Sequence, residues 1–347
     1  MRKHKKGVID AVLLLVLIAI TAYFTLDDQN INNIIDTIQD AEDSWLILAI
    51  GFVFVFVCGE SVIMKYLYKV LGTPVKILQC IKYSFVGFFF SLVTPSATGG
   101  QPMQLYYMGK DNHKISESAL VLLIITIGYK AALLVMSGIA FISQGEFILI
   151  HLDYVAYLLI YGVIVNVLFI AFLMMLIFRE EYTHTFIRWI TGGLGKLHLI
   201  RNVEAFQSKV FEMMQPYRQG AGYLKKHKNV FFHVLWMSIL QRSALFLVTW
   251  CVYKSFGLSG ISMLKIVALQ TIISLSVDML PLPGGVGVSE KSFEIMFDVI
   301  FGASLVIPGM ILSRGISFYL LVVVTGIVTV LQHAVMVLKE RKNMSGK

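Results

Sequence analysis

Charged residues are scarce in this sequence. Lysine, arginine, aspartate and glutamate together make up 14% of the 347 residues, whereas apolar residues make up 57%. A soluble domain of this length needs far more surface charge to remain dispersed in water. Because long apolar runs recur along the whole chain, the composition instead predicts an integral membrane protein with the lipid bilayer as its main solvent.

Residues and motifs that carry metal, redox or nucleotide chemistry are also missing. The three cysteines, Cys58, Cys80 and Cys251, lie inside apolar runs without metal-ligand spacing, as expected of small hydrophobic side chains. Neither the histidine–glutamate pattern of zinc enzymes nor the P-loop sequence of ATP-hydrolysing modules occurs. We therefore expect no cofactor and no metal, and no ATP-driven motor within this chain.

The net charge of +8 has a particular meaning in a membrane protein. Binding of nucleic acid requires a soluble basic patch with aromatic platforms, and none stands apart from the apolar segments, so we expect no nucleic-acid partner. Basic residues instead mark the segments that stay cytoplasmic. The amino terminus, residues 179–229 and the carboxy terminus are basic, whereas residues 27–44 carry only acidic charges.

Uninterrupted apolar length defines the expected membrane-spanning helices. The six such segments are residues 8–26, 45–68, 115–143, 152–178, 230–253 and 306–338. Two further apolar regions, 77–108 and 260–302, are interrupted by proline and glycine at 94–102 and 281–287. All basic segments face the cytoplasm only if each interrupted region enters and leaves on one side, with a short outer loop near Glu146.

The expected fold is therefore all-α: a polytopic membrane protein with six full transmembrane helices plus two re-entrant helical hairpins, in an inverted-repeat arrangement. Each hairpin and its two flanking spans form a triplet, and the two triplets have opposite orientation, as in many transporters. We expect a single domain over residues 1–347 in the cell (plasma) membrane, with both termini cytoplasmic. Residues 179–229 are expected to form a cytoplasmic amphipathic segment, packed on the inner leaflet or on the protein's own cytoplasmic ends.

The two interrupted segments supply the first group of candidate site residues. Proline removes amide donors and glycine lets the backbone turn, so the freed main-chain groups must be buried in protein or line a wet cavity. A helix that restarts at such a break points its positive end inward, which suits an anionic group such as phosphate. The alternative is a pair of proline-kinked helices without a ligand. The candidates are Pro95, Ser96, Thr98, Gly99, Gly100, Gln101, Pro102, Pro283, Gly284, Gly285, Gly287 and Glu290.

Ionisable residues within apolar stretches form the second group. An unpaired charge at the bilayer centre costs at least about 3 kcal/mol, so these residues must pair with one another or line a cavity. The basic candidates for binding a lipid phosphate are Lys130, Arg242 and Arg314. The acidic candidates for balancing them, meeting a cationic headgroup or carrying protons are Glu60, Asp278 and Glu290. The alternative is a set of purely structural ion pairs.

Both interrupted segments resemble signatures of one family. Residues 95–102, PSATGGQP, resemble the P-S-x-x-G-G-x-P signature of the lysylphosphatidylglycerol synthase transmembrane region, and residues 281–290, PLPGGVGVSE, resemble its P-x-P-G-G-x-G-x-x-E signature. The resemblance covers nearly the whole chain. In longer members, such as the multiple peptide resistance factor, this region moves aminoacylated phosphatidylglycerol to the outer leaflet. A separate cytosolic domain makes that lipid, which confers resistance to cationic peptides.

The resemblance implies a flippase-type translocator of an anionic or aminoacylated phospholipid. The sequence ends at Lys347, soon after its last span, so we expect no synthase domain and no enzymatic activity of the chain by itself. Gln101 stands where an acidic residue is expected in many members. Two alternatives stay open: a component of a phosphatidylglycerol lysyltransferase with a separate catalytic partner, and a secondary transporter of a small polar solute. The expected partners are membrane phospholipids; a separate lipid-modifying synthase and a homo-oligomer stay open.

Overall fold

The computed structural model describes residues 31–152, 154–178 and 227–345, together with isolated positions between 185 and 222. Every regular element within these ranges is a helix, and no strand occurs there. The predicted span 8–26 lies outside the described residues, and so does almost all of the predicted amphipathic segment 179–229.

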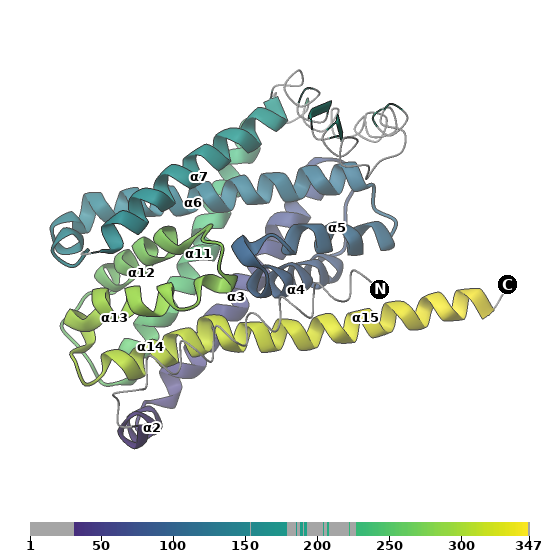
Figure 1. Cartoon of the computed structure of the whole chain (residues 1–347). Coiled ribbons are helices and arrows are strands. Elements are labelled where there is room, and N and C mark those ends of the chain that lie inside the picture. The colour runs from purple at the N-terminus through teal and green to yellow at the C-terminus, as the bar shows by residue number, and fades with distance from the viewer. Residues whose placement is uncertain are drawn as a thin grey trace.

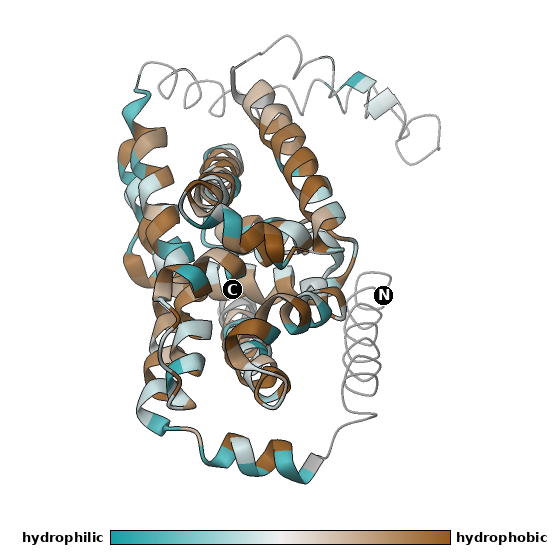
Figure 2. Cartoon of the chain, turned by 90° about the vertical axis from the view of Figure 1, so that its left-hand side faces the viewer, coloured by the Kyte–Doolittle hydropathy of each residue, from teal (hydrophilic) through white to brown (hydrophobic). Residues whose placement is uncertain are grey.

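Five helical stretches have the length and apolar character needed to cross a membrane. They are α3 (Asp43–Val70), α6 (Ile115–Ile150), α7 (Val155–Phe178), α11 (Asn229–Ser255) and a stretch formed by α14 (Val306–Arg314), the π-helical η3 (Gly315–Leu320) and α15 (Leu321–Ser345). Figure 2 shows hydrophobic residues along these helices, and outward-facing Ile142 is 90% exposed. The chain is therefore a multi-pass helical membrane protein, and these five stretches match five of the six predicted spans.

One predicted boundary is wrong. The sequence suggested a loop near Glu146, but α6 continues to Ile150, with only a local departure from helical geometry at Gln144 (φ −135°). The last residues of the helix, 147–150, are apolar, and Ile148 is fully buried in the main hydrophobic cluster. The helix ends at His151, whose ring nitrogen Nδ1 lies 2.7 Å from the carbonyl oxygen of Phe147.

Both proline- and glycine-interrupted regions fold back on themselves. The first comprises α4 (Ile77–Val93), the short helix η1 (Pro95–Ala97) and α5 (Gly100–Lys110). Helices α4 and α5 pack together, and Lys82 near the start of α4 bonds to Asp111 just after α5, at 2.8 Å. We call residues 77–110 the first hairpin and residues 94–99 the first break (Figure 1).

The second region comprises α12 (Met263–Val277), η2 (Pro283–Gly285) and α13 (Val288–Phe301), and α12 packs against α13. The end of α13 returns to the start of α12, and Tyr253 links the two. The ring centres of Phe301, at the end of α13, and Tyr253 lie 5.7 Å apart, and the Tyr253 hydroxyl accepts a hydrogen bond from the amide of Ile261, just before α12. We call residues 263–301 the second hairpin and residues 278–287 the second break.

The packing partners repeat between the two halves of the chain. Helix α3 packs on α11, and each corresponds to the first span of one predicted triplet. The first hairpin packs through α4 on α15 of the other half, and the second packs through α12 on α6 of the other half. This exchange of partners is the pattern that a two-fold structural repeat produces. The short helix α2 (Ile31–Gln39), before α3, lies against α14.

Candidate functional site

The two breaks meet each other, although they lie more than 180 residues apart in sequence. Helices η1 and η2 are in contact, and the hydroxyl of Ser96 donates to the carbonyl oxygens of Leu280 (3.1 Å) and Met279 (3.4 Å). The contact has strained backbone on both sides, because Ser96 (φ 51°), Ala97 (φ 55°) and Met279 (φ 68°) adopt left-handed conformations without being glycine. Such strain persists only where the surrounding structure enforces it, and it is concentrated at functional sites.

Glycine in the first break permits close packing of the chain on itself. A Cβ atom on Gly100 would lie 2.0 Å from the Ser91 Oγ atom and 2.6 Å from the Gly87 carbonyl oxygen, so only glycine lets α5 start this close to α4. Gly99 is similarly confined, and its amide donates to the hydroxyl of Thr94 at 2.8 Å. Close packing therefore explains why both positions are glycine. The expected approach of this backbone to a ligand stays a prediction.

Glycine in the second break permits an unusual backbone path. Gly284 (φ 59°), Gly285 (φ 63°) and Gly287 (φ 88°) all adopt conformations that other residues rarely adopt. A Cβ atom on Gly284 would also lie 2.0 Å from the ring of Phe318. Pro283 is buried at the start of η2. The sequence therefore dictates the turn that brings α13 back beside α12.

The helix end at the second break is capped by the chain itself. Glu290 is only 3% exposed, and its Oε2 atom accepts from the amide of Gly287 at 2.7 Å. Its Oε1 atom accepts from the Arg314 Nε atom at 2.8 Å and lies 3.4 Å from the Tyr319 hydroxyl. Arg314 also donates to the Gly284 carbonyl oxygen at 3.1 Å. The position predicted to attract a phosphate is thus filled by this carboxylate.

A second buried ion pair links the two halves. Lys130 on α6 is 6% exposed, and its ammonium group pairs with Asp278, the residue that follows α12. The pair therefore joins the first half of the chain to the second break. Of the predicted charged residues, Lys130, Asp278, Arg314 and Glu290 form two separate pairs.

Neutral polar contacts surround the first break. The amide of Gln104 on α5 donates to the Glu60 carboxylate on α3 at 2.6 Å, and the amide of Gln101 donates to the hydroxyl of Thr126. Gln104 is 4% exposed, and it packs against Gly87. Glu60 has no cationic partner within 4.0 Å among the described residues, so its nearest strong contact is this neutral amide.

Arg242 on α11 is buried in a different way. It is 2% exposed, its guanidinium carbon lies 3.3 Å from the centre of the Tyr129 ring, and its Nη1 atom donates to the Ser274 hydroxyl at 3.3 Å. Its Nε and Nη2 atoms are buried without an acceptor.

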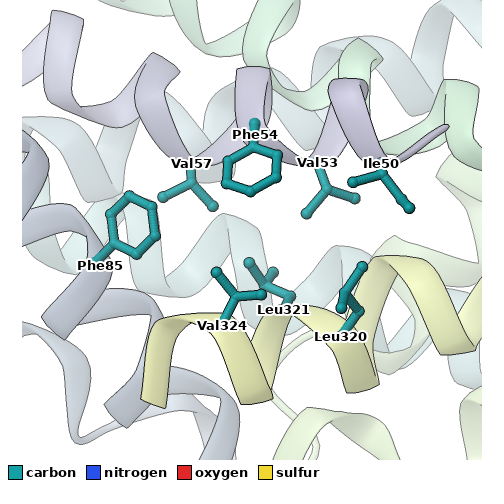
Figure 3. Close-up of a pocket in the computed structure, with 8 residues that line it drawn as sticks. All are labelled: Ile50, Val53, Phe54, Val57, Phe85, Leu320, Leu321 and Val324. Atoms are coloured by element: carbon teal, nitrogen blue, oxygen red, sulfur yellow. The ribbon is translucent and has the colours of Figure 1, made fainter. Parts of the chain in front are cut away.

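Figure 3 shows a small apolar groove between α3, α4 and the η3–α15 segment. Its lining is entirely apolar and comes from α3 (Ile50, Val53, Phe54, Val57), α4 (Phe85), and η3 with α15 (Leu320, Leu321, Val324). Val57 lies one helical turn before Glu60, and Leu320 directly follows Tyr319. Two of its lining residues are therefore close in sequence to Glu60 and Tyr319, which belong to polar contacts described above.

The sequence-predicted residues are distributed over two ion pairs, the Ser96–Leu280 contact and several separate polar contacts, and some serve only their own turn. Thr98 is exposed and donates to the Pro95 carbonyl oxygen within η1, and Pro102 is exposed on α5. Sequence reasoning missed Gln104, Tyr129, Ser274 and Tyr319, which hold the charged side chains. A polar or aromatic residue in an apolar helix is a weak signal by itself, and only the packing shows its partner. No cluster of three or more metal-ligating side chains occurs within the described ranges.

Comparison with known proteins supplies a family. The family described as "Lysylphosphatidylglycerol synthase TM region" matches residues 8–325. A protein named "UPF0104 membrane protein" from Methanothermobacter thermautotrophicus is 22% identical over 296 residues, which cover 82% of this chain and 85% of the relative. Both breaks and every predicted charged residue lie inside the matched range.

Proposed function

Because the chain belongs to the family of the lysylphosphatidylglycerol synthase transmembrane region, we propose that it moves an anionic or aminoacylated phospholipid, similar to lysylphosphatidylglycerol, between the leaflets of the cell membrane. The observation that carries the proposal is the contact of the two breaks next to buried charges. Irregular backbone and ionised groups at membrane depth are tolerated only where protein buries them or water reaches them.

In this proposal the two hairpins are re-entrant and enter from opposite leaflets, with both termini cytoplasmic. Their tips meet at Ser96 and Leu280, which closes the path between the two sides. Transport requires that this contact opens, so that the headgroup passes through the polar region between the hairpins. The repeated packing of α4 on α15 and of α12 on α6 gives the two halves equivalent surfaces on which to move.

The apolar groove explains how acyl chains remain in a lipid-like environment. It runs between α3 and the η3–α15 segment, next to the residues that hold the polar clusters (Figure 3). A phospholipid placed with its headgroup near Glu60 and Tyr319 would lay an acyl chain along Val57, Leu321 and Val324. Apolar burial contributes about 25 cal/mol per Å², so a chain seated there is held without any polar contact.

The test is a lipid-scrambling measurement with purified protein. Proteoliposomes would carry tail-labelled fluorescent phosphatidylglycerol or lysylphosphatidylglycerol, and dithionite would bleach the label in the outer leaflet. In protein-free vesicles the inner-leaflet label is protected, whereas we expect it to become accessible in vesicles that contain the protein. Unchanged protection for both lipids, with protein insertion verified, would overturn the proposal.

The same vesicles separate the alternatives. Uptake of a small polar solute without lipid movement would favour a secondary transporter. Copurification with a lipid-modifying synthase, together with lipid movement only in its presence, would favour a synthase component. Asp298→Asn serves as a control variant in these vesicles. Asp298 is an exposed acidic residue on α13 that takes part in neither ion pair, so this variant should move lipid at the rate of the wild type.

A further inference from the structure

The buried cations of this chain are not equivalent. Lys130 is paired with Asp278 and Arg314 with Glu290, whereas Arg242 has no acidic side chain within 4.0 Å in the part of the chain that the structure describes. An arginine remains charged at any physiological pH, so it cannot relieve its burial by losing a proton. Within the described ranges, Arg242 is therefore a buried positive charge that contacts no carboxylate.

The contacts that Arg242 makes leave one edge of its guanidinium without a hydrogen-bond acceptor among the described residues. Its face rests on the Tyr129 ring at 3.3 Å, and its Nη1 atom donates to Ser274. The atoms without an acceptor are Nε and Nη2. These two N–H groups point in the same direction, and this is the edge with which arginine binds two oxygens of a carboxylate or phosphate.

A second unsatisfied polar group lies on the same face of α11. The hydroxyl of Ser238, one helical turn before Arg242, is buried and has no hydrogen-bond partner in the part of the chain that the structure describes. It lies against α6 near Gly128, the residue before Tyr129. A buried donor without a partner is unfavourable, and a cation on an aromatic face recovers only part of the loss. An anion bound here would give these donors an acceptor.

The nearby acidic groups do not supply that anion. Asp278 is held by Lys130, and Glu60 accepts from Gln104. Neither carboxylate comes within 4.0 Å of an Arg242 nitrogen, so neither serves as the acceptor for its Nε and Nη2 atoms.

We propose that the Nε and Nη2 atoms of Arg242, supported by Tyr129, bind the phosphate of the transported lipid, with Ser238 as an additional donor. This inference rests on the proposed function and assigns the phosphate to Arg242 rather than to Lys130 or Arg314. Those two cations are positioning residues, because their carboxylate partners fix the second break. Transport then selects phosphate-bearing lipids.

The test uses Arg242→Gln and Arg242→Lys in the full chain, with Lys254→Gln as a matched control at the far end of the same helix. Translocation of fluorescent phosphatidylglycerol is compared with that of a phosphate-free glycolipid. We expect Arg242→Gln to slow phosphatidylglycerol about tenfold or more, since a hydrogen bond to a charged group contributes about 1.5–3 kcal/mol. We expect Arg242→Lys to restore part of the rate and Lys254→Gln to leave it unchanged.

A binding measurement keeps the test informative if a variant folds poorly or no lipid moves. Inorganic phosphate is added to detergent-purified proteins, and the shift in melting temperature is compared. A shift in the wild type that Arg242→Gln abolishes supports the anion site; if lipid does not move in the same preparation, the proposed function fails and the anion source is a soluble one. Equal phosphatidylglycerol rates, or equal phosphate shifts, in wild type and Arg242→Gln would overturn the assignment of Arg242.

Discussion

The two hairpins have their ion pairs at opposite ends. The first is held at its base by the Lys82–Asp111 ion pair, and near its tip by the neutral contacts of Gln101 and Gln104. The second is held near its tip by the Arg314–Glu290 pair, while its base is closed by aromatic rings around Phe301. An ion pair thus stabilises the tip of the second hairpin, whereas uncharged glutamine amides stabilise the tip of the first.

This difference teaches which part of the centre is rigid. Removing one partner of a buried ion pair typically costs about 3–5 kcal/mol, whereas removing the uncharged donor of one hydrogen bond to a buried group costs about 1–3 kcal/mol. We therefore infer that the second break is the more firmly held, and we expect the first break to open more readily if the proposed transport occurs. Substitutions at equivalent places in the two hairpins test this comparison.

The largest effect is expected for Glu290→Gln. The change removes the countercharge of Arg314 and weakens the cap on the Gly287 amide. We expect the free energy of unfolding in detergent to fall by about 3–5 kcal/mol. The matched control is Glu294→Gln on the same helix, where Glu294 forms an exposed pair with Lys291 and the expected loss is below about 1 kcal/mol. Similar losses in both variants would contradict a dominant role of the buried pair.

Gly284→Ala should come next. The substitution places a side chain where φ is 59° and where the Phe318 ring leaves no room. We expect a loss of about 1–3 kcal/mol, measured by thermal or denaturant unfolding. Gly51→Ala in the apolar helix α3 is the control, because nothing lies within 4 Å of its added Cβ atom, and alanine favours a helix over glycine. A neutral Gly284→Ala would show that the second break tolerates another path.

Gln104→Met probes the first break. It keeps the side-chain length but removes the donor to Glu60, so the carboxylate loses its 2.6 Å partner. We expect a loss of about 1–3 kcal/mol in the free energy of unfolding, smaller than that of Glu290→Gln. An equal or larger loss would reverse the order of rigidity between the two breaks. Gln101→Met, at an exposed position on the same helix, should change stability less.

The smallest effect is expected at the base of the first hairpin, which lies outside the spans. Burial raises the pKa of Asp111, but hydrogen bonds from Lys82 and Tyr83 lower it more, so the net pKa is below its ordinary value. A lowered pKa stabilises the fold above the unfolded value of about 3.9, and this contribution is lost as the pH falls through the folded pKa.

Asp111→Asn should therefore reduce the free energy of unfolding at neutral pH by at most about 1 kcal/mol. The gap between wild type and variant should shrink as the pH falls below about 4, as measured by unfolding at a series of pH values. Asp298→Asn, an exposed substitution on α13, serves as the reference for general charge effects. A gap that is constant with pH would show that the carboxylate of Asp111 stabilises the hairpin only through its shape.

Sequence by itself determined the local features. Apolar length predicted five described spans within a few residues, and the proline and glycine clusters predicted where α4 and α12 end. These features depend on neighbours along the chain, because a helix in lipid must satisfy its own backbone and a proline must interrupt it. The loop predicted near Glu146 failed because tertiary packing of Ile148 extends α6 beyond the most apolar stretch.

Only the tertiary structure decided how the charges are matched. The pairing of Lys130 with Asp278 spans 148 positions, and the contact of Ser96 with Leu280 spans 184. Hydropathy lists buried charges but contains no information on which helices are adjacent. Which residues pair depends on which side of each helix faces its neighbour. Tertiary packing therefore places Lys130 and Arg314 beside carboxylates, whereas Arg242 has no countercharge in the described structure.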